Sequence, residues 1–147
     1  MNSQEYVIIV ADDDDDDILL INDVFDSLNT GFQLHSVGNG KELIEYLDQL
    51  SGSNDLVDRK KPGLVFLDIN MPIMNGIETL KEIRKHGRYP CVPVVMLTTS
   101  YHRETIDVCY EYGAVGFLTK PGEFQVFEKK IGETLTYWFD TIRHPIA

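Results

Sequence analysis

The sequence has few cysteines and no long apolar run, and each shortage excludes a class of protein. Its two cysteines, Cys91 and Cys109, are too few for a disulfide framework and lack metal-ligand spacing. We expect both to be reduced thiols. No apolar run approaches the ~20 residues that span a bilayer. Residues 1–5 lack the basic start and the apolar stretch of a signal peptide. We therefore expect a cytoplasmic protein that does not bind membranes.

Basic residues are also scarce, with 13 Lys and Arg against 24 Asp and Glu, and the net charge is −11. Binding to the phosphate backbone of DNA or RNA needs a basic surface, so we expect no nucleic-acid partner. The apolar fraction of 43% and the length of 147 residues are those of an ordinary globular protein with one hydrophobic core. The sequence predicts a single domain over residues 1–147.

Strand and helix patterns alternate five times along the chain. Apolar runs typical of strands occupy residues 6–11, 32–37, 63–67, 93–97 and 116–119. Apolar residues at helical spacing follow them, around residues 18–28, 43–47, 77–83, 103–112 and 124–142. This alternation predicts an α/β fold, a doubly wound parallel sheet of five strands with helices on both faces.

One segment, residues 50–62, interrupts the alternation. It contains Ser51-Gly-Ser-Asn-Asp and Arg59-Lys-Lys-Pro, which are turn-rich and charged. We expect an exposed insertion loop before the third strand. Loop-length statistics favour a tolerated surface loop over a binding loop at this place.

Six consecutive aspartates, Asp12–Asp17, follow directly on the apolar run Tyr6–Ala11. An acidic run is usually a solvated tail, but here a strand pattern precedes it and a helical pattern follows. Acidic residues at the carboxyl end of a buried strand lie where open α/β sheets bind ligands. Clustered carboxylates need a cation to offset their repulsion, and oxygen-only ligands favour Mg²⁺ ahead of Ca²⁺ or Mn²⁺.

Polar side chains of different kinds follow four of the five predicted strands. In chain order they are Asp12 with Asp13, Asp68, Thr98 with Thr99, and Lys120. Because parallel strands end at one edge of the sheet, we expect these side chains to converge. Asp68 could then attack phosphorus as a carboxylate nucleophile. A cation, Lys120 and the Thr98 hydroxyl would offset the charge on the phosphoryl oxygens. Each residue alone has a simpler explanation as a cap, a turn residue or a surface charge, but the combination favours phosphoryl chemistry.

From Val7 to about Ile142 the chain resembles the receiver domain of two-component response regulators. The motifs that carry the resemblance are Leu-Asp-Ile-Asn-Met-Pro-Ile-Met-Asn-Gly at 67–76, Met-Leu-Thr-Thr-Ser at 96–100 and Gly-Phe-Leu-Thr-Lys-Pro at 116–121. The resemblance implies a (βα)5 flavodoxin-like fold with strand order 2-1-3-4-5. It also implies that Asp68 is the phosphoacceptor and that Thr98 and Lys120 are its catalytic partners.

The resemblance also implies a switch and a metal site. Thr98 and Phe117 would report phosphorylation by changing position. Mg²⁺, or Mn²⁺ in its place, would be bound by the carboxylates of Asp12, Asp13 and Asp68 and by the backbone carbonyl of Asn70.

The chain departs from the family pattern at the end of the first strand. The family has two adjacent acids there, whereas this chain has Ala11 at the first place and Asp12 at the second. Asp12 is therefore expected to be the direct ligand, with Asp13 as the second carboxylate. Asp14–Asp17 are expected to form a charged turn and a helix start, where negative charge is favourable.

The implied function is that of a phosphoacceptor response regulator without an attached output domain. A sensor histidine kinase or a phosphotransfer protein would donate the phosphoryl group. The protein would catalyse only its own phosphorylation and dephosphorylation, and would signal by binding a downstream protein or a second copy of itself. The segment before the third strand and the last helix with Trp138 are similar to stand-alone receivers associated with phytochrome-like or hybrid kinases.

Two other functions stay open. A pseudo-receiver could serve as an interaction module without phosphorylation. A phosphohydrolase of the haloacid dehalogenase type also uses an Asp nucleophile with Mg²⁺. That family has a second Asp two residues after the nucleophile, where this chain has Asn70.

Overall fold

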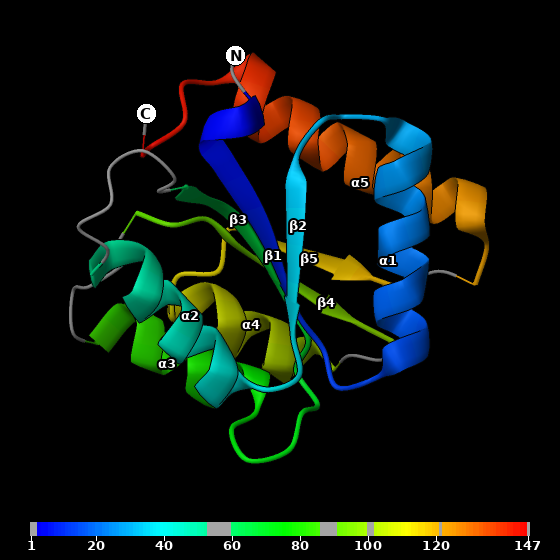
Figure 1. Cartoon of the computed structure of the whole chain (residues 1–147). Coiled ribbons are helices and arrows are strands. Elements are labelled where there is room, and N and C mark those ends of the chain that lie inside the picture. Colours follow the sequence, from blue (N-terminus) through cyan, green and yellow to red (C-terminus); the bar gives the residue numbers. More distant parts are fainter. Residues whose placement is uncertain (1–2, 53–59, 86–90, 100–101, 121, 147) are drawn as a thin grey trace.

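Parallel strands form one sheet in the order β2-β1-β3-β4-β5 (Figure 1). The computed structural model describes residues 3–52, 60–85, 91–99, 102–120 and 122–146. Within these ranges the strands are β1 (Tyr6–Ala11), β2 (Gln33–Val37), β3 (Lys61–Leu67), β4 (Val94–Thr98) and β5 (Gly116–Thr119). The parallel pairing and the strand order confirm the predicted flavodoxin-like fold.

Helices cover both faces of the sheet. In the described part of the chain the α-helices are α1 (Asp15–Leu28), α2 (Gly40–Gly52), α3 (Gly76–Lys85), α4 (Arg103–Glu111) and α5 (Phe124–Thr136). Figure 1 shows α1 and α5 on one face and α2, α3 and α4 on the other. No helix among these residues is long and apolar enough to cross a membrane.

The central strand β1 is buried along its whole length, as its continuous apolar run predicts. Its side chains alternate between two cores. Val7, Ile9 and Ala11 face the core beneath α2, α3 and α4, whereas Tyr6, Ile8 and Val10 face the core beneath α1 and α5. A strand buried on both faces fixes the register of its neighbours, because a slip of one residue would exchange the two sets of side chains.

The predicted insertion loop at residues 50–62 is wrong at both ends. Leu50 to Gly52 form the last turn of α2, and Lys61 and Pro62 begin β3, where they pair with Tyr6 and Val7. The turn-rich, polar composition of this segment predicts a loop, although its first residues complete the helix. Pro62 has no backbone N–H to donate to the neighbouring strand. It is tolerated because the register of β3 against β1 shifts directly after its pair with Val7. Residues 53–59 lie outside the described residues.

The apolar spacing predicts a regular helix to Ile142, but the α-helix ends before that residue. The α-helix ends at Thr136, and a π-helix over Tyr137–Thr141 follows, closed by the Ile142 N–H donating to the Tyr137 carbonyl at 3.2 Å. The wider turn directs Phe139 into the core, where it contacts the rings of Tyr6 and Phe32 at centroid distances of 5.1 and 4.6 Å.

Candidate functional site

The carboxyl ends of β1, β3, β4 and β5 bring together the polar residues predicted to form the site. Asp12, Asp68 and Thr98 are all buried there. Backbone hydrogen bonds connect the strand ends: the Asp68 N–H donates to the Ala11 carbonyl at 2.9 Å, and the Lys120 N–H donates to the Thr98 carbonyl at 2.7 Å. The sheet itself therefore positions the side chains. Ser100 and Pro121 of the motifs lie outside the described residues.

Three carboxylates form a cluster that could hold a metal ion. One oxygen from each of Asp12, Asp13 and Asp68 lies within 4.8 Å of the others. Asp12 and Asp68 are buried, and Asp13 is exposed, so the cluster opens to solvent on one side. An all-oxygen donor set fits a hard divalent cation such as Mg²⁺. The arrangement agrees with the predicted ligands, whose metal-binding role stays a prediction.

The Asp68 carboxylate is held in a defined orientation and a low-dielectric environment. The backbone N–H groups of Ile69 and Asn70 donate to it. Burial raises the pKa of Asp68 to about 6, an effect that the Lys120 ammonium opposes and the Asp12 carboxylate reinforces. Near neutral pH the group is an ionised, poorly solvated carboxylate, which is a suitable nucleophile and cation ligand.

Lys120 lies among the carboxylates with only 5% of its side chain exposed. Its Nζ atom donates to Asp12 Oδ2 and, at 2.8 Å, to Asp17 Oδ2, and it lies 3.6 Å from Asp68 Oδ2. Burial alone would lower the pKa of Lys120, but the hydrogen bonds to Asp12 and Asp17 outweigh it and raise the pKa. Lys120 therefore stays charged, as an electrostatic partner of Asp68 must.

Sequence reasoning missed the contact of Asp17 with Lys120. The prediction of a helix start is confirmed, since Asp14 is the N-cap of α1 and accepts from the Asp16 and Asp17 N–H groups at 2.9 and 3.4 Å. Asp17 lies in the first turn of that helix, four residues after Asp13. No signal in the sequence indicates this contact, because a run of identical residues does not distinguish a residue that faces the site from one that faces solvent.

The loop between β3 and α3 is closed tightly against Asp68. The Gly76 N–H donates to the Ile69 carbonyl at 2.8 Å, and a Cβ atom at Gly76 would lie 2.2 Å from the Asp68 carbonyl oxygen. Only glycine allows this approach. Asn75 caps α3 by accepting from the Glu78 N–H at 2.9 Å, and Glu78 accepts from the Asn75 N–H in return. Asn75 and Gly76 therefore close this loop and begin α3.

The predicted switch residues lie on neighbouring strands. Thr98 ends β4 and is fully buried, whereas Phe117 on β5 is partly buried against the core beneath α2, α3 and α4. Phe117 pairs with Met96 across the two strands. Their coupling stays a prediction.

Comparison with known proteins places this arrangement in a family. Residues 8–132 match the response regulator receiver domain. The response regulator Rcp1 of Synechocystis sp. is 27% identical over 128 residues, which span 87% of this chain and 85% of the relative. The crystal structure of the phosphorylated cyanobacterial phytochrome response regulator RcpA has a TM-score of 0.82 and 26% identity, covering 96% of this chain and 99% of that one.

A further crystal structure, the Mn²⁺-bound form of response regulator Rcp1, has a TM-score of 0.79 and 26% identity. The match covers 95% of this chain and 99% of that one. The likeness thus covers most of the chain, and the residues matched to the family, 8–132, include Asp12, Asp68, Thr98 and Lys120. This chain belongs to the response regulator receiver domain family.

Proposed function

We propose that this chain is a phosphoacceptor of a two-component phosphorelay and that Asp68 receives the phosphoryl group. The observation that carries the proposal is the position of Asp68, a buried carboxylate 3.6 Å from the Lys120 ammonium and within 4.8 Å of the oxygens of Asp12 and Asp13. Nucleophile, cation ligands and a fixed positive charge are thereby assembled at one sheet edge. The whole chain, residues 1–147, would form a single receiver domain.

The chemistry requires positioning and charge cancellation. A carboxylate oxygen of Asp68 forms a bond to phosphorus while the P–N bond of a phosphohistidine, or the P–O bond of acetyl phosphate, breaks. The imidazole of the histidine, or acetate, is the leaving group. The Lys120 ammonium neutralises one oxygen of the transferred group, and the Thr98 hydroxyl donates a hydrogen bond to another. Mg²⁺, or Mn²⁺ in its place, bound by Asp12, Asp13, Asp68 and the Asn70 carbonyl, would supply further positive charge.

The residue two places after Asp68 argues against turnover of external phosphate esters. Two residues after Asp68 the chain has Asn70, which cannot serve as a general acid or base for a leaving group. The proposed chemistry is therefore limited to self-phosphorylation from a phosphodonor and to autodephosphorylation.

The protein would act in the cytoplasm, and its phosphoryl donor would be a sensor histidine kinase or a phosphotransfer protein. The likeness to RcpA, a phytochrome response regulator, favours a kinase of the phytochrome-like or hybrid type. The output would be a phosphorylation-dependent contact with a downstream protein or a second copy of the chain. With a net charge of −11, nucleic acid is not a proposed partner.

Phosphorylation by acetyl phosphate with Mg²⁺ tests the assignment. Intact-mass spectrometry should show one added phosphoryl group that is labile in base, and Asp68→Asn should show none. Asp107→Asn, on the exposed face of α4, is the matched control and should be labelled like the wild type. Label retained in Asp68→Asn would overturn the assignment. An unlabelled wild type would support the pseudo-receiver, and steady release of phosphate from an external ester would support the phosphohydrolase.

A further inference from the structure

The Lys120 ammonium has three carboxylate neighbours, and Asp68 is the most distant of them. Nζ donates to Asp12 and to Asp17, the latter at 2.8 Å, whereas Asp68 Oδ2 is 3.6 Å away. Asp17 is itself only 26% exposed in its side chain. Its ion pair with Lys120 joins the first turn of α1 to the end of β5, two elements far apart in the sequence.

The three carboxylates differ in what else they can bind. Asp12 and Asp68 belong to the cluster with Asp13, but Asp17 does not. A divalent cation in the cluster and the Lys120 ammonium would therefore compete for the oxygens of Asp12 and Asp68, and would repel each other across a poorly solvated space. A carboxylate outside the cluster relieves that competition, because it gives the ammonium a partner of its own.

Asp17 is well placed for this role because its backbone is fixed. It is the third residue of α1 and lies three residues after the N-cap Asp14, whose side chain accepts from the Asp17 N–H. Asp14 is in turn connected to the cluster, since its N–H donates to Asp12 Oδ1 at 3.0 Å. The start of α1 thus holds Asp17 at a set distance from the cluster.

We propose that Asp17 is a positioning residue for Lys120: it retains the ammonium at the site and leaves Asp12 and Asp68 available to a divalent cation. The proposal deepens the proposed function, on which it rests for the identity of the cation cluster. Without Asp17, Lys120 would pair with Asp12 and Asp68 alone, and the cation would bind against an uncompensated positive charge.

Calorimetric titration of the full chain with Mg²⁺ tests this role without any phosphoryl donor. Asp17→Asn should weaken Mg²⁺ binding about fivefold, the effect of losing one partly screened ion pair. Asp16→Asn removes the same charge from the same helical turn, and Asp16 is exposed, so it should weaken binding no more than about twofold. Asp17→Glu should restore part of the affinity, because it restores the charge near Lys120.

A second set of variants shows whether Asp17 acts through Lys120. In a Lys120→Met background, Asp17→Asn and Asp16→Asn should weaken Mg²⁺ binding equally, because the ammonium is gone. Lys120→Gln serves in its place if thermal unfolding shows that the Met variant does not fold. A full Asp17→Asn effect without Lys120 would mean that Asp17 acts on the cation directly, and would overturn the proposal. If Asp17→Asn and Asp16→Asn bind Mg²⁺ equally well in the otherwise wild-type chain, the role of Asp17 is overturned. If Asp68 is still phosphorylated by acetyl phosphate in that case, the proposed function is unaffected.

Discussion

The backbone N–H of Asp68 donates to the carbonyl of Ala11 at 2.9 Å, and this hydrogen bond places the proposed nucleophile directly beside Asp12. It continues the parallel register in which Ala11 pairs with Leu67. The two carboxylates therefore meet because two buried strands end in register, rather than because a flexible loop folds over the site. Such a site is held as rigidly as the sheet itself.

Protons and a cation compete for Asp68, so Mg²⁺ affinity should depend on pH. Burial raises the pKa of Asp68 to about 6, so falling pH protonates the carboxylate well above the usual range of an aspartate. Since a ligand carboxylate must be ionised, we expect Mg²⁺ to bind about tenfold more weakly near pH 5 than near pH 8. Calorimetric titration across this range measures the change. Asp68→Asn should lose this dependence, and an equally steep profile in that variant would contradict the assignment.

The switch hypothesis concerns Thr98 and Phe117. We expect Thr98→Ala to accept the phosphoryl group but to respond weakly, because a buried hydroxyl that could move towards the phosphoryl oxygens is gone. The ring resonances of Phe117, followed by NMR with and without beryllofluoride, should shift strongly in the wild type and by less than about half as much in Thr98→Ala. Unchanged Phe117 resonances in the wild type would mean that this ring is ordinary core packing.

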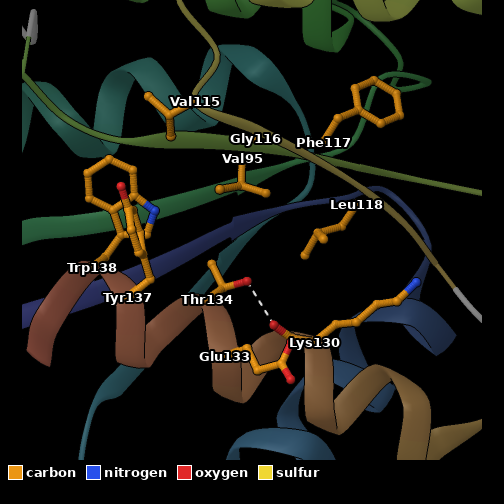
Figure 2. Close-up of a pocket in the computed structure, with 10 residues that line it drawn as sticks. All are labelled: Val95, Val115, Gly116, Phe117, Leu118, Lys130, Glu133, Thr134, Tyr137 and Trp138. Carbon is orange, nitrogen blue, oxygen red and sulfur yellow. Dashed lines mark hydrogen bonds between the residues drawn. The ribbon is translucent and has the colours of Figure 1, made fainter. Parts of the chain in front are cut away.

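A hollow of about 280 Å³ lies between β5 and the end of α5 (Figure 2). Its lining includes Val115 and Tyr137, which are 44% and 49% exposed, and Trp138, which is partly buried. If this surface binds a second copy, beryllofluoride should strengthen self-association in sedimentation velocity, and Trp138→Ala should weaken it about tenfold, as loss of an aromatic anchor does.

Leu19→Ala is the matched control for the dimer, since Leu19 is 60% exposed on α1 and is not among the residues that line the hollow. It should associate like the wild type. One monomeric species with and without beryllofluoride would exclude the homodimer and leave only a different protein as partner. Phe139, the residue after Trp138, is buried in the core and does not line the hollow.

His144 should make stability depend on pH. It is buried, its Nε2 lies 2.6 Å from the Gly63 carbonyl, and its Nδ1 accepts from the Ile146 N–H at 3.1 Å. These contacts assign the neutral ring with the proton on Nε2. Burial lowers the pKa of His144, the hydrogen bond to Gly63 opposes this, and Lys61 adds to it.

Because the folded pKa is lowered, the stabilisation is present above the pKa of the unfolded chain, about 6.5, and is lost as the pH falls. His144→Ala should cost about 1–2 kcal/mol of unfolding free energy near pH 8 and less near pH 5, measured by urea unfolding. His102→Ala, at an exposed position, should cost little at either pH. A cost for His144→Ala that does not change with pH would contradict the neutral-ring assignment.

The sequence predicted most of the fold because its strongest patterns have few alternatives. The apolar run of β1 matches the observed strand from Tyr6 to Ala11, and distinct polar types after four strands predicted which residues would converge. Two features could not be predicted. Apolar residues continue in steps of three and four past Thr136, so the sequence does not mark the change to a π-helix. Asp17 is identical to its neighbours in the sequence, so only the structure shows that it contacts Lys120.

The packing of Phe139 and His144 has a practical consequence for the length of any fragment prepared from this chain. The family match ends at residue 132, yet Leu135, Phe139 and His144 are buried beyond it. Phe139 stacks on His144 and contacts Tyr6, and a Cβ atom at Gly63 would lie 2.8 Å from the Phe139 ring. A fragment cut at the family boundary would expose the amino ends of β1 and β3 to solvent. Expression and crystallisation should therefore retain the chain through Ile146.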